Sequence, residues 1–143
     1  MREGEGKAVR DGISSRILIV EDEPTNRALL QIALKHKHCL VETASNGLLA
    51  VEKWEQGSYD LIIMDVQMPV MDGIAATQAI REKEQERGGR TPILAMTAHA
   101  SRDDEARCLA SGMDAYLAKP VDLSELIAVA GKLVLERAEA QHD

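Results

Sequence analysis

A chain of 143 residues is long enough to form one domain with a buried core. Its formal net charge of −7 argues against a broad electrostatic attraction to nucleic acid or to an anionic membrane. Aromatic residues make up 2% of the chain and phenylalanine is absent, so base-stacking platforms are not expected. The core is therefore expected to consist of Leu, Ile, Val, Ala and Met.

The sequence carries no signal for membrane insertion or for disulfide bonding. No apolar run approaches the length of a transmembrane helix, and the N-terminus has no apolar signal core. The spacing of Cys39 and Cys108 fits neither a disulfide framework nor a zinc site. We therefore expect a cytoplasmic protein that does not insert into a membrane.

Strands and helices are expected to alternate five times along the chain. Residues 1–14 are polar and glycine-rich, which predicts a disordered tail or a linker. Apolar runs predict buried strands at Arg16–Val20, Cys39–Ala44, Leu61–Met64, Pro92–Thr97 and Asp114–Ala118. Amphipathic segments predict helices from Pro24 to about His36, Asn46 to about Gly57, about Ile74 to Arg87, Ser101 to Ser111, and Asp122 through Val134.

This alternation predicts an α/β fold, in which right-handed crossovers build a doubly wound parallel sheet with helices on both faces. We place the domain at residues 15–138 and a short tail at 139–143. The first two helices are expected to pack on the sheet through apolar stripes. These stripes are Leu29, Leu30, Ala33 and Leu34 in the first helix, and Leu48, Leu49, Val51 and Trp54 in the second.

Four of the five expected strands end in residues that suit phosphoryl chemistry. The ends carry Glu21-Asp22, Asp65, Thr97 and Lys119, and the carboxyl ends of parallel strands meet at one edge of a sheet. Three crowded carboxylates would repel one another without a cation, and hard oxygen ligands suit Mg²⁺. Asp65 could then accept a phosphoryl group covalently. Thr97 and Lys119 could stabilise the charge on the transferred oxygens.

These motifs resemble the receiver domain of two-component response regulators over about residues 16–134. The resemblance rests on Glu21-Asp22, Asp65 with Met68-Pro69-x-x-Asp72-Gly73, Met96-Thr97-Ala98 and Lys119-Pro120. Among receivers, those of hybrid sensor histidine kinases are the most similar. Their likeness lies in Glu21-Asp22-x-x-x-Asn26-Arg27, the run from Asp65 to Gly73, and Thr97-Ala98-His99-Ala100.

The resemblance implies a flavodoxin-like (βα)5 fold with strand order 2-1-3-4-5. It implies a signalling domain rather than an enzyme, one that catalyses only its own phosphorylation and dephosphorylation. Asp65 would take a phosphoryl group from a phosphohistidine of a histidine kinase or a histidine phosphotransfer protein, and phosphorylation would switch partner binding. A second copy of the chain and an effector protein are further candidate partners.

The resemblance also implies a role for each site residue. Mg²⁺ would be bound by Asp22, by Asp65 and by the backbone carbonyl of Gln67, with Glu21 acting through water. The phosphate-contacting and switch residues would be Thr97, Lys119 and Tyr116, and Gln67 and His99 would tune the lifetime of the phosphoryl group. A cis peptide bond is expected between Lys119 and Pro120.

Blander interpretations exist for single residues. Glu21 and Asp22 could simply favour a helix N-terminus, Tyr116 could belong to the core, and Asp72 is expected to be a loop cap. His36, His38 and Cys39 suggest a polar helix end rather than a metal site, since no fourth ligand is near.

Three other protein classes are disfavoured. A haloacid-dehalogenase-type phosphatase needs a second acid two residues after its nucleophile, where this chain has Gln67. A flavodoxin-like FMN module needs a phosphate loop after the first strand, and the acids at residues 21–23 would repel that phosphate. A metal-free pseudo-receiver would lack a site residue, and none is missing here.

The chain stops soon after its last expected helix, so its output is expected to pass through a partner rather than a further domain. A free-standing regulator and the receiver of a larger hybrid kinase remain alternatives.

Overall fold

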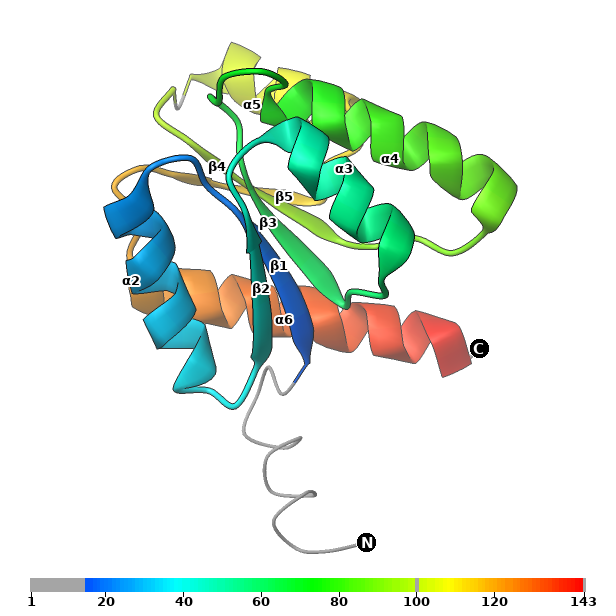
Figure 1. The fold of residues 1–143 in the computed structure, drawn as a ribbon, viewed down its shortest axis with the longest axis horizontal. Coiled ribbons are helices and arrows are strands. Elements are labelled where there is room, and N and C mark those ends of the chain that lie inside the picture. Colours follow the sequence, from blue (N-terminus) through cyan, green and yellow to red (C-terminus); the bar gives the residue numbers. More distant parts are fainter. Residues whose placement is uncertain (1–14, 100, 143) are drawn as a thin grey trace, which may run out of the picture.

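The computed structural model describes residues 15–99 and 101–142, in which five strands and five helices alternate (Figure 1). The strands are β1 (Arg16–Val20), β2 (Leu40–Ala44), β3 (Leu61–Asp65), β4 (Ile93–Thr97) and β5 (Ala115–Ala118). The helices are α2 (Pro24–Lys35), α3 (Gly47–Gln56), α4 (Gly73–Arg87), α5 (Arg102–Ala110) and α6 (Leu123–His142).

All four strand pairs are parallel, and the sheet has the order β2-β1-β3-β4-β5. The flavodoxin-like fold and its strand order are therefore confirmed. Most element boundaries fall within a residue or two of the expected ones. Helix α6 is the exception, because it continues past residue 138. The division there into domain and tail stays a prediction, and the expected tail at 1–14 lies outside the described residues.

Each face of the sheet has its own apolar core, because successive strand residues point to opposite faces. On one face Leu18, Ile62 and Ala95 pack with side chains from α3, α4 and α5. On the other face Ile17 and Ile63 pack with side chains from α2 and α6. Figure 1 shows these two helical layers on opposite sides of the sheet.

The expected apolar stripes of the first two helices are partly wrong. Leu29 is 52% exposed, and Leu48 and Leu49 are 45% and 39% exposed. Helix α3 instead packs through the stripe that begins at Gly47 and continues at Ala50, Val51 and Trp54. This i, i+3, i+4, i+7 stripe turns both leucines to the opposite side of the helix.

Two aromatic residues also belong to the core, and only Trp54 was expected there, as part of the apolar stripe of the second helix. Trp54 and Tyr59 are each 3% exposed and pack in the α3–α4 layer. Each satisfies its polar atom, as buried Trp and Tyr usually do. The Trp54 indole N–H donates to Thr91 Oγ1 at 3.1 Å, and the Tyr59 hydroxyl donates to Glu42 Oε1 at 3.1 Å.

The expected helix signals act as caps. Side chains of Asn46, Asp72 and Ser101 each accept a hydrogen bond from a backbone N–H in the first turn of α3, α4 and α5. Asp122 accepts from Glu125 N at the start of α6. Gly88 caps the C-terminus of helix α4, and its φ of 86° favours glycine. Within the described residues, we find no helix with the length and apolarity needed to cross a bilayer.

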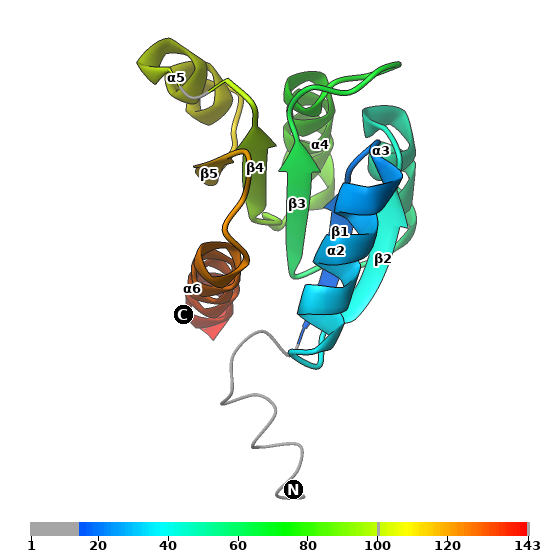
Figure 2. The ribbon, with the colours of Figure 1, turned by 90° about the vertical axis from the view of Figure 1, so that its left-hand side faces the viewer.

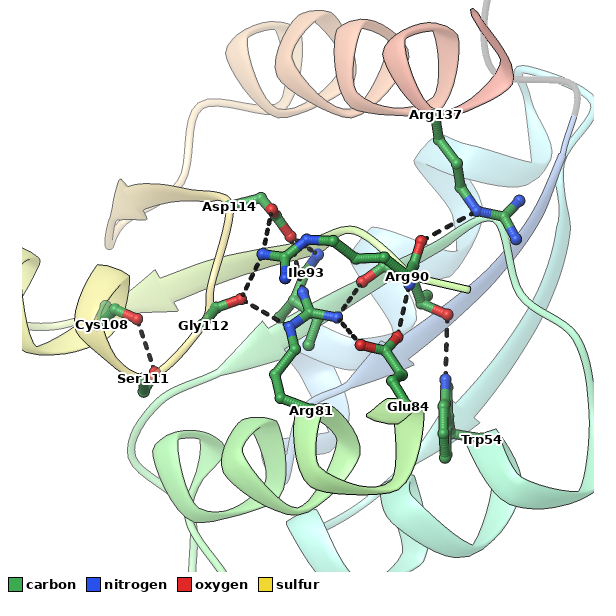
Figure 3. Close-up of polar contacts among 11 residues, drawn as sticks. Trp54, Arg81, Glu84, Arg90, Ile93, Cys108, Ser111, Gly112, Asp114 and Arg137 are labelled. Atoms are coloured by element: carbon green, nitrogen blue, oxygen red, sulfur yellow. Dashed lines mark hydrogen bonds and ion pairs between the residues drawn. The ribbon is translucent and has the colours of Figure 1, made fainter. Parts of the chain in front are cut away.

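An arginine on α4 connects three segments at the end of the sheet opposite the strand carboxyl ends (Figure 3). Arg81 donates to Glu84 Oε1 at 2.7 Å, to Asp114 Oδ2 at 2.9 Å, and to the carbonyl oxygens of Thr91 and Gly112 at 2.8 and 2.9 Å. The side chains of Arg81 and Glu84 are 13% and 7% exposed, so the pair is largely removed from water.

The two acids in this network also bind backbone N–H groups that precede and begin β4. Glu84 Oε2 accepts from Thr91 N at 2.7 Å, and Asp114 Oδ2 accepts from Ile93 N at 2.9 Å. Arg81 therefore fixes the ends of α4, β4 and β5 relative to one another.

We expect Arg81→Met to lower the free energy of unfolding by about 3 kcal/mol, because it leaves Glu84 buried without its cation. Urea unfolding followed by circular dichroism measures the change. Lys83→Met is the matched control, since it removes the same charge from the same helix. The ion pair of Lys83 with Glu55 is about half exposed, so its loss should cost close to nothing. Equal losses in the two variants would contradict the structural role of Arg81.

Candidate functional site

The parallel register brings the predicted site residues to one edge of the sheet. Asp65 and Thr97 are the last residues of β3 and β4, and Figure 2 shows these two strands ending at the same edge. Backbone hydrogen bonds extend the ladder past the other strand ends. Glu21 N donates to Ala44 O at 3.1 Å, and Lys119 N donates to Thr97 O at 2.8 Å. The predicted convergence is observed for all of these residues.

Lys119 contacts two buried carboxylates at once. Its Nζ lies 3.0 Å from Asp65 Oδ2 and 3.2 Å from Glu21 Oε1. The side chains of Asp65 and Glu21 are each 1% exposed, whereas that of Lys119 is 24% exposed. One ammonium group thus faces two acids, and the pair of carboxylates is only partly neutralised.

Burial, followed by the neighbouring Glu21 carboxyl, raises the pKa of Asp65 to about 7. The Lys119 ammonium opposes this shift but does not cancel it. Burial lowers the pKa of Lys119, yet Asp65 and Glu21 together raise it above its ordinary value. A further cation at this edge would therefore favour the ionised form of Asp65, which is the form that can act as a nucleophile.

The acids fit a magnesium ion. Glu21, Asp22 and Asp65 each place a carboxylate oxygen within 4.8 Å of the others, and this is the only such group of acids, histidines or cysteines among the described residues. Asp22 is exposed while the other two are buried. Oxygen ligands with one side open to water match the preference of Mg²⁺ for an octahedral shell that keeps several waters.

A side chain that the sequence did not single out for this contact binds the Thr97 hydroxyl. Gln67 Nε2 donates to Thr97 Oγ1 at 2.9 Å, and Gln67 Oε1 accepts from Ala98 N at 3.1 Å. The hydroxyl also accepts from His99 N at 3.0 Å and donates to His99 O at 3.2 Å. The hydroxyl thus uses its one donor and both of its acceptor positions in hydrogen bonds with Gln67 and His99.

The loop after Asp65 follows a tightly constrained path. Met71 N donates to Pro69 O at 2.8 Å, and Val70 between them has a φ of 70°, which together make a strained γ-turn. A Cβ at Gly73 would lie 2.3 Å from Asp65 O, so only glycine fits there. The loop is thereby held against the end of β3.

Other expectations near the site have mixed outcomes. The cis peptide bond between Lys119 and Pro120 is confirmed. Asp72 caps α4, as expected. Tyr116 is half-buried on β5 and packs against the α3–α4 core, and its role as a switch stays a prediction. The ligand role of the Gln67 carbonyl also stays a prediction.

A sequence profile of the response regulator receiver domain matches residues 17–130. The chain belongs to this family. It is thus a receiver domain of two-component signalling, and the expected likeness to receivers of hybrid sensor histidine kinases agrees with the relatives below.

Curated relatives include the sensor protein GacS of Pseudomonas syringae, which is 44% identical over 80% of this chain and 13% of its own length. The sensor histidine kinase RcsC of Escherichia coli is 38% identical over 96% of this chain and 14% of its own length. The chain thus spans a small part of the relatives that it matches.

Solved structures of receivers match closely. The receiver domain of a sensor histidine kinase from Pseudomonas aeruginosa, with a magnesium ion in its active-site cleft, has a TM-score of 0.76 at 39% identity and covers 84% of this chain and 97% of its own. The receiver of Saccharomyces cerevisiae Ssk1, solved with the histidine phosphotransfer protein Ypd1, has a TM-score of 0.76 at 37% identity, covering 82% and 89%.

We expect Asp22→Ala to weaken Mg²⁺ binding at least about tenfold, or about 1.4 kcal/mol, because it removes the most accessible acid of the group. Titration of backbone amide chemical shifts with MgCl₂ measures the affinity. Asp103→Ala on α5 is the control, since it removes the same charge from an exposed helix start. Unchanged affinity in Asp22→Ala would rule out a ligand role for Asp22.

Proposed function

We propose that Asp65 accepts a phosphoryl group from a phosphohistidine in a Mg²⁺-dependent reaction, and that this modification switches partner binding. The observation that carries the proposal is the Asp65 carboxylate, buried at the end of the central strand between the Lys119 ammonium and two further acids. A carboxylate in this setting can act as a nucleophile, because a positive charge lies on one side of it and metal-binding acids lie on the other.

Asp65 Oδ attacks phosphorus, an O–P bond forms, and the N–P bond to the donor imidazole breaks, leaving its electron pair on nitrogen. Lys119 leaves Glu21 to bind a transferred oxygen, which keeps its charge close to the developing negative charge. Bound by Asp22, Asp65 and the Gln67 carbonyl, with Glu21 acting through water, Mg²⁺ would supply the remaining positive charge.

The phosphoryl group brings roughly −1.5 to −2 charges beside Thr97. To donate to a phosphoryl oxygen, the Thr97 hydroxyl must give up its bond to His99 O and turn away from Gln67. This movement vacates space behind β4 into which Tyr116 rotates. The two states differ by only a few kcal/mol, so the unphosphorylated protein already samples the active one.

Hydrolysis sets how long the phosphoryl group lasts. A hollow of about 520 Å³ beside the site is lined by Gln67, His99, Arg107 and the start of the β3–α4 loop. Water reaching the phosphoryl group from this side passes the Gln67 and His99 side chains. This placement supports their role in tuning the phosphoryl lifetime.

The phosphoryl donor is a histidine kinase or a histidine phosphotransfer protein. An open hollow of about 490 Å³ lies next to Lys119 and is lined largely by apolar side chains, Leu29 and Val121 among them. Exposed apolar surface beside a reactive group supports docking of a partner there. The yeast receiver solved with its phosphotransfer protein supports the same class of partner. An effector or a second copy of the chain would read the switched state.

We further propose that the domain acts in the cytoplasm and catalyses only its own phosphorylation and dephosphorylation. A phosphatase mechanism finds no general acid at residue 67, because the Gln67 amide is not ionisable and binds Thr97.

We expect Asp65→Asn to take up no radiolabel from a phosphorylated phosphotransfer protein, since the amide oxygen is too weak a nucleophile. Asp72→Asn is the matched control in the same loop. Asparagine caps a helix as well as aspartate does, so this variant should fold and accept label like the wild type. Labelling of Asp65→Asn at the wild-type level would refute the assignment.

We expect Thr97 and Tyr116 to act together in the switch. A double-mutant cycle with Thr97→Ala and Tyr116→Ala measures partner affinity with and without Mg²⁺-beryllofluoride, a phosphoryl mimic. The mimic should change partner affinity strongly in the wild type and much less in each single variant. In the double variant its effect should be as small as in the single variants. If the mimic has the same effect in all four proteins, output depends on the local charge alone.

A further inference from the structure

Arg27 on α2 binds the backbone of the acidic segment that follows β1. Its Nη1 donates to the carbonyl oxygen of Glu21 at 2.9 Å, and the side chain is half-buried. Arg27 lies in the first turns of α2, where a cation is opposed by the helix dipole. Helix stability therefore does not account for an arginine at this position.

The acid loop, defined here as residues 21–23, is anchored through Glu21. Four polar atoms of Glu21 have partners: N with Ala44 O at 3.1 Å, Oε1 with Lys119 Nζ at 3.2 Å, Oε2 with Glu23 N at 3.2 Å, and O with Arg27 Nη1 at 2.9 Å. The first three fix the residue and its side chain. The fourth fixes the plane of the peptide that joins Glu21 to Asp22.

The orientation of that peptide decides in which direction the Asp22 side chain leaves the backbone. The peptide plane sets φ of Asp22 and, with it, the direction of its Cα–Cβ bond. Asp22 is exposed, and among the described residues no hydrogen bond or ion pair reaches its carboxylate. The direction of its Cα–Cβ bond therefore depends on the backbone, and the backbone carbonyl before it is bound by Arg27.

We propose that Arg27 is a positioning residue for the metal site, which holds the Glu21–Asp22 peptide so that Asp22 faces Asp65. The proposal rests on the Mg²⁺-dependent phosphoryl transfer proposed above, and it assigns a role in that reaction to one further residue. Arg27 contacts neither the metal nor the phosphoryl group in this scheme. It acts through the Glu21 carbonyl.

Simple electrostatics predicts the opposite effect of its removal. Arg27 carries a positive charge beside an acidic group that binds a cation. If charge alone mattered, neutralising Arg27 would strengthen Mg²⁺ binding, because one repulsion would be lost. If the hydrogen bond positions Asp22, neutralising Arg27 weakens Mg²⁺ binding. The sign of the change therefore separates the two accounts.

The test uses Arg27→Met, which keeps the aliphatic stem, and Arg27→Lys, which keeps the charge and one group of donors. Mg²⁺ affinity is measured by amide chemical-shift titration with MgCl₂. Losing one hydrogen bond that orders a ligand should weaken binding about fivefold, or about 1 kcal/mol, in Arg27→Met. Arg27→Lys should recover most of this loss. Lys35→Met, at the other end of the same helix, is the control and should bind as the wild type does.

A second readout is the Mg²⁺ concentration that gives half the maximal rate of phosphorylation, which should rise by the same factor in Arg27→Met. Tighter or unchanged Mg²⁺ binding in Arg27→Met would overturn the proposal, and so would binding by Arg27→Lys as weak as that of Arg27→Met. Failure of the wild type itself to bind Mg²⁺ or to accept phosphate would instead refute the proposed function.

Discussion

The contact of the Lys119 ammonium with Asp65 and Glu21 is the constraint on which the rest of the site depends. Both carboxylates are 1% exposed, so each needs compensation for its lost hydration. One ammonium group supplies only part of it, and the pKa of Asp65 stays raised to about 7. A further cation at the site would therefore be stabilising, which agrees with the Mg²⁺-dependent phosphoryl acceptor that we propose.

The register of the parallel strands brings these side chains into contact, so no long flexible loop is needed. Glu21 and Lys119 are 98 residues apart in the sequence, yet both follow strands of one parallel sheet and lie at the same edge. At the opposite end, Arg81 connects α4 with the starts of β4 and β5. The loop from Met68 to Asp72 and the hydrogen bonds of Gln67 and Arg27 then set the finer geometry. Rigid strands thus carry the candidate reacting groups, and side-chain hydrogen bonds in the loops orient them.

The fold and the gathering of the candidate site residues at one edge of the sheet could be predicted because they depend on local patterns. Buried apolar runs define the strands, and Asp65 follows such a run directly. The contacts of Gln67 and Arg27 could not be predicted, because each joins a side chain to a backbone or hydroxyl group whose position depends on the folded loops. The exposure of Leu29, Leu48 and Leu49 was also missed, since apolar spacing alone does not tell which side of a short helix the sheet covers. The same limit applies to Tyr59, whose burial depends on partners far away in the sequence.

The most direct test of this account is a crystal structure of the protein with Mg²⁺ and beryllofluoride. The account predicts a beryllium–oxygen bond to Asp65, a magnesium ion bound by Asp22 and Asp65, and Lys119 Nζ in contact with a fluoride instead of Glu21. It also predicts that Thr97 Oγ1 has left His99 O to contact the mimic. Beryllofluoride bound at another residue, or Lys119 still joining Asp65 to Glu21 beside a bound mimic, would contradict it.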